Sequence, residues 1–226
     1  MNYRLILPAF AAAVCFTLTA ACAATPAPAP TMAPMSSPTV APTQAPLTDA
    51  EQTFVTQTSA LLQRLYPTVA AAKAHGYVPL SARFDASNTQ IYTDLRFDGI
   101  TLDHPNFLWY DRSGSLVGVD YELRKSEYPT PPHLATYPVQ DLRWSPIGQH
   151  VHLAYRLHGQ LKYAGAHATP ALRTSHLTAA MLRRAKLLPA GATLVWASFH
   201  PAVWDLAMWT VPNSNGPFAD LNPAVK

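Results

Sequence analysis

Cysteine is missing from all of this chain except its first 22 residues, which hold both Cys15 and Cys22. The remainder therefore forms no disulfide, offers no thiolate to a metal and carries no cysteine nucleophile. Its stability has to come from packing alone. A domain of roughly 180 residues can be stable in this way, because folding at that size buries about 70% of the surface of the unfolded chain.

Charged residues are scarce and nearly balanced. They make up 13% of the 226 residues, and 16 Lys and Arg against 13 Asp and Glu give a formal net charge of +3. That balance gives no reason to expect nucleic acid or a strongly acidic partner. The hydrophobic content of 49% is typical of a globular protein rather than a disordered one.

Familiar catalytic signatures are missing as well. Residues 114–118 read Gly-Ser-Leu-Val-Gly, so the serine is in the wrong place for a Gly-x-Ser-x-Gly nucleophile elbow. The sequence also lacks a phosphate-cradling glycine loop, a His-Glu-x-x-His motif and a recognisable pair of catalytic carboxylates. These absences lower the expectation of an enzyme without excluding one.

The first 22 residues are typical of an export signal. Arg4 precedes an apolar run over residues 5–18, and the small residues at 19–21 come before Cys22. The run is too short for a comfortable membrane span, which needs about 20 residues. Its last four residues resemble the lipobox of bacterial lipoproteins, although Thr19 stands where that motif usually has Leu.

Two fates are open to the exported chain. If Cys22 is lipidated it becomes the mature N-terminus, and the lipid anchors the protein in a membrane. Ala23 then favours the periplasm-facing outer membrane of a diderm host, because an Asp at that place resembles an inner-membrane retention signal. Simple cleavage within residues 21–24 is the alternative, and it gives a secreted or periplasmic protein.

Residues 23–47 differ sharply in composition from residues 48–226. Pro, Ala, Thr, Ser and Met dominate, and proline recurs every few residues from Pro26 to Pro46. Regular proline denies the segment a helix and favours an extended chain that advances about 3.1 Å per residue. We predict a disordered tether that holds the domain off a surface, while a disordered segment without a mechanical role would have the same composition.

Residues 48–226 are expected to form a single globular domain that begins with helices. Thr48 and Glu51 are spaced as a capping box at a helix start. Gly76 suits the left-handed position after a second helix, and Ser175 is placed to cap a third. The predicted helices cover residues 48–65, 68–75 and 176–186.

The rest of the domain is predicted to consist of strands and loops. Residues 107–121 have the alternation and central turn of a β-hairpin, whereas Gly159, Gly165 and Pro170 indicate a loop. The expected fold class is α+β, with a mainly antiparallel sheet packed against the N-terminal helices and one later helix. The predicted strands cover residues 107–110, 116–121, 193–200 and 204–211.

Residues 144–157 are the best candidate for a central strand, around which the rest is organised. Read with a period of two, the segment has an apolar side and a side that carries two imidazoles. The two sides are formed by Val151, Leu153, Tyr155 and Leu157, and by His150, His152, Ala154 and Arg156.

His150 and His152 lie close enough on one strand face to hold one metal ion, and imidazole suits a divalent transition metal such as Zn, Cu or Ni. A third ligand could come from His200 or His104, at the ends of predicted neighbouring strands. The alternative is a His-x-His pair that is only solvated or hydrogen-bonded. Arg156 and Asp205 are candidates for groups that orient a ligand.

Aromatic residues provide a second candidate site. The tryptophans and several tyrosines concentrate in the strand regions, where they could line a ligand pocket or a protein interface. The alternative is that they fill a core that has no disulfides. The candidate ligand or interface residues are Trp144, Arg156, Trp204 and Trp209.

Several motifs from Tyr66 onward occur together. They are Tyr66-Pro67 before an Ala-rich helix to Gly76-Tyr77, the hairpin over 108–121, His150-Val151-His152, and a segment over 204–223 with Trp209, Asn215-Gly216, Phe218 and Asn222-Pro223. As a set they resemble a family of uncharacterised exported bacterial proteins, and the resemblance implies export but no particular activity. Members often carry His ahead of the tyrosine near Tyr92 and before the last Trp, where this chain has Ile91 and Ala207.

Three functions fit these patterns. The first is an exported, non-catalytic envelope protein that binds a small ligand or a protein partner through its sheet face. The second is a metal-binding protein or metal-dependent enzyme that uses His150 and His152, with His200 as a candidate third ligand. The third is a structural module that associates with itself.

Overall fold

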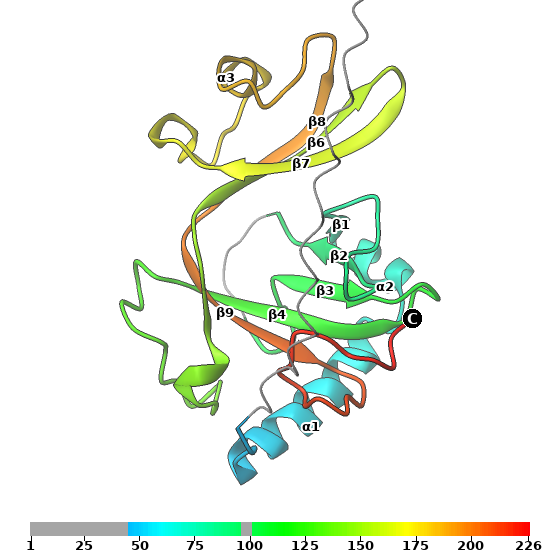
Figure 1. Ribbon diagram of the computed structural model, residues 1–226, viewed down its shortest axis with the longest axis vertical. Coiled ribbons are helices and arrows are strands. Elements are labelled where there is room, and N and C mark those ends of the chain that lie inside the picture. The colour runs from blue at the N-terminus through cyan, green and yellow to red at the C-terminus, as the bar shows by residue number, and fades with distance from the viewer. Residues whose placement is uncertain (1–44, 96–100) are drawn as a thin grey trace, which may run out of the picture. The chain divides into compact units, whose positions relative to one another are not determined.

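The computed structural model describes residues 45–95 and 101–226, all of which belong to one compact unit over Pro42–Lys226. The predicted export signal with Cys22, and nearly all of the predicted tether, lie outside the described residues. Within them the predicted α+β class is confirmed: helices accompany two antiparallel sheets (Figure 1). No helix in these two ranges is both long and apolar enough to span a membrane.

Three α-helices are present in the described ranges, and each begins at a threonine. Thr48 and Glu51 form the predicted capping box of the first helix, and Thr68 caps the second. The prediction of Ser175 as the third cap was wrong, because the side chain of Thr178 accepts from the Met181 backbone and starts the helix three residues later. The helices are α1 (Asp49–Leu65), α2 (Val69–Ala74) and α3 (Ala179–Arg184).

The strands divide between a six-stranded and a three-stranded sheet, where one sheet was expected. In spatial order the first comprises β1 (Val78–Pro79), β2 (Gln90–Thr93), β3 (Phe107–Tyr110), β4 (Leu116–Arg124), β9 (Val203–Trp209) and β5 (Ser145–Ile147). The second comprises β7 (Gln160–His167), β6 (His150–Leu157) and β8 (Thr193–His200).

Strand β7 corrects the prediction of a loop after residue 157. His158 and Gly159 both have positive φ angles, 51° and 78°, which suits a two-residue hairpin turn. The chain therefore reverses at once, and all eight residues of β7 pair with β6. Gly165 and its small or polar neighbours hid this strand, because an exposed edge strand carries little of the apolar alternation that sequence reading detects.

Two stretches of chain pass from one sheet to the other, as the continuous ribbons of Figure 1 show. Gly148 and Gln149 separate β5 from β6, and Pro201 and Ala202 separate β8 from β9. Ile147 pairs with Val203 on one side of this double bend, and His150 pairs with His200 on the other. The bend therefore places the start of β6 and the end of β8 beside the six-stranded sheet.

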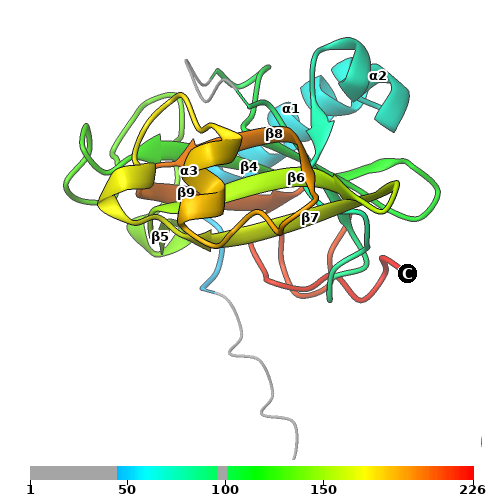
Figure 2. The ribbon, with the colours of Figure 1, turned by 90° about the horizontal axis from the view of Figure 1, so that it is seen from above.

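Each sheet has its own apolar core. α1 packs with residues such as Phe54 and Leu62 against the six-stranded sheet. α3 lies over β6 in the view from above (Figure 2), and its buried Leu182 packs with Val151 and Leu153. The predicted apolar side of the β6 strand is therefore confirmed as its core side, and the imidazole side faces the other way.

A buried ion pair fixes the first helix to the segment before β5. Glu51 is fully buried and accepts hydrogen bonds from Arg143 Nε at 2.9 Å and from the Gln140 side chain at 2.9 Å. Burial by itself would raise the pKa of Glu51, but the hydrogen bonds from Arg143, Thr48 and Gln140 together lower that pKa to about 2.

The free energy of unfolding is therefore expected to depend on pH through the ionisation of Glu51. Its pKa is lower in the folded chain than the ordinary 4.5, so its contribution is fully present above pH 4.5 and is lost as the pH falls towards 2. Urea unfolding between about pH 6 and pH 3 measures this loss. Glu51→Gln should flatten that part of the profile, and an unchanged slope in this variant would contradict the assignment.

Candidate metal centre

Four histidines share one face of the three-stranded sheet. His150 on β6 pairs directly with His167 on β7 and with His200 on β8, so three imidazoles form a row across the strands. His152 lies two residues further along β6 and therefore projects to the same face. The sequence predicted three of these four residues as ligand candidates and assigned His167 to a loop.

The two histidines of β6 meet through their ring nitrogens. Nε2 of His150 lies 2.7 Å from Nε2 of His152, and the ring centroids are 4.4 Å apart. The other nitrogen of His150, Nδ1, donates a hydrogen bond to the carbonyl oxygen of Gly148 at 2.8 Å. Nε2 of His150 is therefore the acceptor, and His152 Nε2–H donates to it.

His200 sits against this pair and joins the two sheets. Its ring stacks on His150 with centroids 4.3 Å apart and on Phe107 at 6.1 Å. Nδ1 lies 2.8 Å from the carbonyl oxygen of Pro201, and Nε2 lies 2.8 Å from Glu122 Oε2 on β4. Because both His200 and Glu122 are buried, this contact is shielded from water.

Burial keeps the imidazoles uncharged. Desolvation lowers the pKa of His152 to about 3, with smaller effects from His150 and His200, and it lowers the pKa of His200 to about 4. Desolvation also lowers the pKa of His150, and the neighbouring His200 and His167 act in the same direction. At neutral pH these rings therefore have lone pairs to offer a metal.

Two further carboxyl groups of the six-stranded sheet lie next to Glu122, which contacts His200. Glu122 pairs with Asp205 across β4 and β9, and Asp120 shares the face of Glu122 two residues away. Trp109 Nε1 donates to Asp120 Oδ2 at 2.8 Å. Asp205 Oδ1 is buried and has no hydrogen-bond partner within the described part of the chain.

Burial disfavours the charged forms of these carboxyl groups. Burial raises the pKa of Glu122, and it raises the pKa of Asp120 and of Asp205, to which neighbouring carboxylates add. His200 Nδ1 donates to the Pro201 carbonyl oxygen, so one proton lies between His200 Nε2 and Glu122 Oε2. The pair carries no net charge whichever of these two atoms holds that proton.

The imidazoles do not converge on one point. Over residues 45–95 and 101–226, no three His, Asp or Glu side chains are arranged so as to hold a metal ion together. The reason is that His200 directs Nε2 towards Glu122, away from the contact between His150 and His152. A three-ligand centre therefore requires a ring of His200 or His167 to turn.

His104, the remaining predicted ligand, contacts a different set of residues. Its Nε2 lies 2.7 Å from Asp94 Oδ2, and its ring packs against Tyr77. Asp205, predicted as an orienting group, does lie at the centre opposite Glu122. The other predicted orienting group, Arg156, is exposed and donates to the carbonyl oxygen of Gly159 at 3.4 Å.

The candidate tryptophans have contacts that belong to the framework of the fold. Trp144 is buried in the core beside Tyr137. Trp209 is buried, donates to the carbonyl oxygen of Ala219 at 2.6 Å and packs on Trp109. Trp204 is half-buried and donates to the carbonyl oxygen of Tyr128. These contacts favour the core-filling interpretation of the aromatic residues.

The sequence analysis did not predict three residues of this region as candidates, although the sequence pattern indicates two of them. Asp120 and Glu122 alternate along β4 between buried apolar residues, which indicates two acids on one strand face. No sequence pattern indicates His167, because its pairing with His150 depends on the hairpin turn at Gly159.

Ile91 and Ala207, the two positions named in the sequence comparison above, lie on the six-stranded sheet. Ala207 pairs with Asp120, and Ile91 pairs with Trp109. Both positions are therefore on rows of residues that cross the sheet near the buried carboxyl groups.

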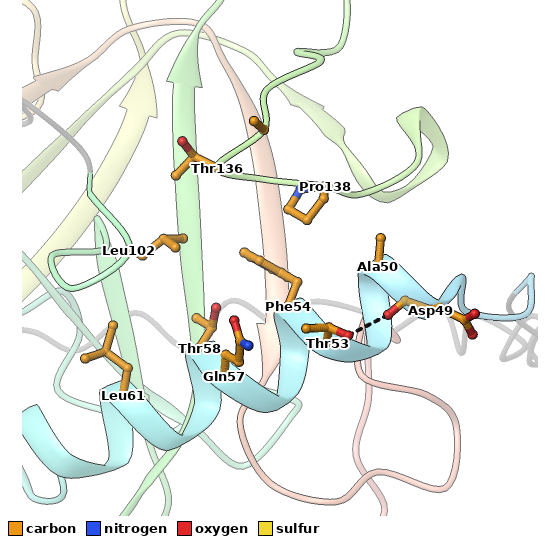
Figure 3. Close-up of a pocket in the computed structure, with 11 residues that line it drawn as sticks. Asp49, Ala50, Thr53, Phe54, Gln57, Thr58, Leu61, Leu102, Thr136 and Pro138 are labelled. Atoms are coloured by element: carbon orange, nitrogen blue, oxygen red, sulfur yellow. Dashed lines mark hydrogen bonds between the residues drawn. The ribbon is translucent and has the colours of Figure 1, made fainter.

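A separate groove of about 580 Å³ runs along α1. Figure 3 shows Phe54, Leu61 and Leu102 along it, with Thr136 and Pro138 on the opposite side. Its described lining contains one acidic residue, Asp49, and no histidine. The groove therefore offers apolar contact and little of the chemistry found at the imidazole row.

Comparison with known proteins found no matching protein family, no similar curated protein and no similar solved structure.

Proposed function

We propose that this protein binds a divalent transition metal ion, such as Zn²⁺, through Nε2 of His150 and Nε2 of His152. The observation that carries the proposal is the 2.7 Å separation of these two atoms. Two imidazole nitrogens that each lie about 2.0–2.1 Å from one ion are on the order of 3 Å apart. The ion would take the place of the proton between the rings, and His152 would change to the tautomer that carries its proton on Nδ1. The two rings would then separate by a few tenths of an ångström.

The surroundings of His150 support this proposal. A histidine that binds a metal through one nitrogen usually donates its other N–H to a carbonyl or carboxylate, which fixes the tautomer. The Gly148 carbonyl already has that role for His150. The Nε2 atom of His150 is therefore unprotonated, and its lone pair could bind a metal ion without a change of tautomer.

A third ligand is available on either side of His150. His200 is stacked against it and would leave Glu122 by a rotation of its ring, while His167 lies on the exposed neighbouring strand. Water or a bound ligand would complete the coordination sphere, as in sites that keep an open position. With the predicted export signal, this makes the protein a proposed metal-binding protein of the cell envelope.

Elemental analysis of the purified protein, after loading with Zn²⁺ and removal of free metal, tests the proposal. We expect about one ion per chain and a loss of affinity of at least ~100-fold in His150→Ala with His152→Ala, since even the loss of a supporting contact typically costs about 10–100-fold. Co²⁺ loading should give visible absorption bands in the parent protein that the double variant lacks.

His133→Ala with His176→Ala is the matched control, because both histidines are exposed and belong to other parts of the fold. This control should keep the metal. Equal metal content in the His150/His152 double variant, or no stoichiometric metal in the folded parent protein, would contradict the proposal. Absence of metal would leave the ligand- or partner-binding function as the better interpretation.

A further inference from the structure

Charge is distributed unevenly along this chain. All 13 acidic residues lie outside residues 148–202, which comprise the three-stranded sheet, α3 and the segments that connect them. We call this part the basic lobe, because it holds six cations and no Asp or Glu, a formal charge of +6 against +3 for the whole chain. The cations, all of them exposed, are Arg156, Lys162, Arg173, Arg183, Arg184 and Lys186.

The dipole of helix α3 explains only part of this pattern. Arg183 and Arg184 lie in the last turn of α3, where a cation is favourable without any ligand. Arg156 and Lys162 lie on β6 and β7, where the helix dipole has no such effect. Among the described residues, none of the six cations forms an ion pair with a carboxylate. The basic lobe therefore has a positive field that attracts anions.

A pocket of about 410 Å³ lies within the basic lobe, between α3 and the short 3-10 helix Pro170–Leu172. Leu172, Met181 and three alanines form its apolar wall, and the polar residues in its described lining are Thr169 and Arg184. The volume is within the range of about 300–1,000 Å³ that is usual for small-molecule sites. This lining suits a ligand that is apolar over most of its length and carries one negative charge.

Arg184 is the charged residue of this pocket. No hydrogen bond or ion pair joins its side chain to the rest of residues 45–95 and 101–226. The neighbouring Arg183, by contrast, donates to the carbonyl oxygen of Ala192 at 2.9 Å and does not line the pocket. Arg183 therefore connects α3 to the segment before β8, whereas the guanidinium donors of Arg184 are available to a ligand.

We propose that this pocket binds a single-chain amphiphile with an anionic head group, such as a fatty acid. The hydrocarbon chain would lie against Leu172 and Met181, and the carboxylate would bind Arg184, whose planar fork matches two oxygen atoms. A purely apolar ligand would leave this cation unpaired, and a small inorganic anion would leave the apolar wall in water. The site is independent of the proposed metal centre, because none of its lining residues belongs to the imidazole row.

The test is a calorimetric titration of the metal-free protein with decanoate at constant ionic strength. We expect saturable binding that weakens at least ~10-fold in Arg184→Gln, because a charge-assisted hydrogen bond is lost. Ala180→Phe should abolish binding by filling the pocket, and Ala180 is exposed, so the core is not disturbed. Lys162→Gln is the matched control, since it removes the same charge from the same lobe outside the pocket. Circular dichroism confirms that each variant is folded.

Further arms identify the class of ligand and its source. Decanol has the same chain without the charge and should bind more weakly, while acetate has the charge without the chain and should not saturate the protein. Stronger binding to phosphatidylglycerol vesicles than to decanoate would overturn the choice of a free amphiphile in favour of a membrane surface. His150→Ala with His152→Ala should leave decanoate binding unchanged, and loss of binding in this variant alone would place the ligand at the imidazole row.

Three results would overturn the proposal outright. They are a failure of decanoate to saturate the protein by ~1 mM, which corresponds to an affinity weaker than about 4 kcal/mol, equal binding by Arg184→Gln or Ala180→Phe and the parent, and an equal loss of affinity in Lys162→Gln and Arg184→Gln. The last result would show that the field of the basic lobe attracts decanoate without a specific contact at the pocket.

Discussion

Glu51→Ala is expected to lower the free energy of unfolding by roughly 3–5 kcal/mol, the range found when one partner of a buried ion pair is removed. The guanidinium of Arg143 would stay buried without its carboxylate, since 1% of the Arg143 side chain and none of the Glu51 side chain is exposed. The same variant also removes the acceptor for the Thr48 backbone N–H in the capping box. Urea unfolding at neutral pH measures the effect.

Asp49→Ala is the matched control for this prediction. Asp49 occupies the same first turn of α1 but is exposed, so its loss should have a much smaller effect on stability. Arg143→Ala should resemble Glu51→Ala, and the double variant should cost clearly less than the sum of the two, because neither charge is then left alone. A small effect of Glu51→Ala would show that the pair is solvated in the protein.

Gly118→Ala is expected to destabilise the protein by about 1–3 kcal/mol or more, as overpacking of a filled site does. A Cβ atom at Gly118 would overlap with the Trp109 ring, whose Cε3 is the nearest atom. The indole cannot move away easily, because its Nε1 donates to Asp120 and its ring packs on Trp209 with centroids 5.2 Å apart. Urea unfolding and near-ultraviolet circular dichroism, which reports on packed indoles, measure the change.

Gly148→Ala provides the control, because apart from its two chain neighbours no atom of the described residues lies within 4 Å of a Cβ at that position, and its φ is not in the left-handed region. This variant should be nearly neutral. If Gly118→Ala matched it in stability and in its spectrum, the close approach of Trp109 to the β4 backbone would be refuted.

Some elements of the fold could be predicted from the sequence because they depend on neighbouring residues. The Thr48 capping box, the hairpin over β3 and β4, and the strand from His150 are set by residues close together in the chain, and all three are present as predicted. Strand β7 was missed because its side chains are largely exposed. Polar and apolar residues alternate only over residues 160–163, and pairing with β6 makes the whole of 160–167 a strand.

The candidate metal centre was likewise predicted only in part. The spacing of His150 and His152 placed two imidazoles on one strand face, because alternation is a property of any extended chain. The assignment of His104 as a ligand stays a prediction, and its ring nitrogen contacts Asp94. Glu122, which lies 78 residues before its partner His200 in the chain, could be connected to it only by the way that β4, β9 and β8 are arranged.

The sequence by itself determined the α+β class, the helix starts at Thr48 and Thr68, and the two faces of β6, because caps and strand alternation are local properties. Tertiary structure decided that β5–β6 and β8–β9 bend together between two sheets, and so brought His150, His200 and Glu122 into contact. The physical reason is that pairing between distant strands depends on backbone hydrogen bonds, which all residue types can form, although proline has no N–H to donate. The sequence can therefore show which residues share a strand face, but only the folded chain shows which faces meet.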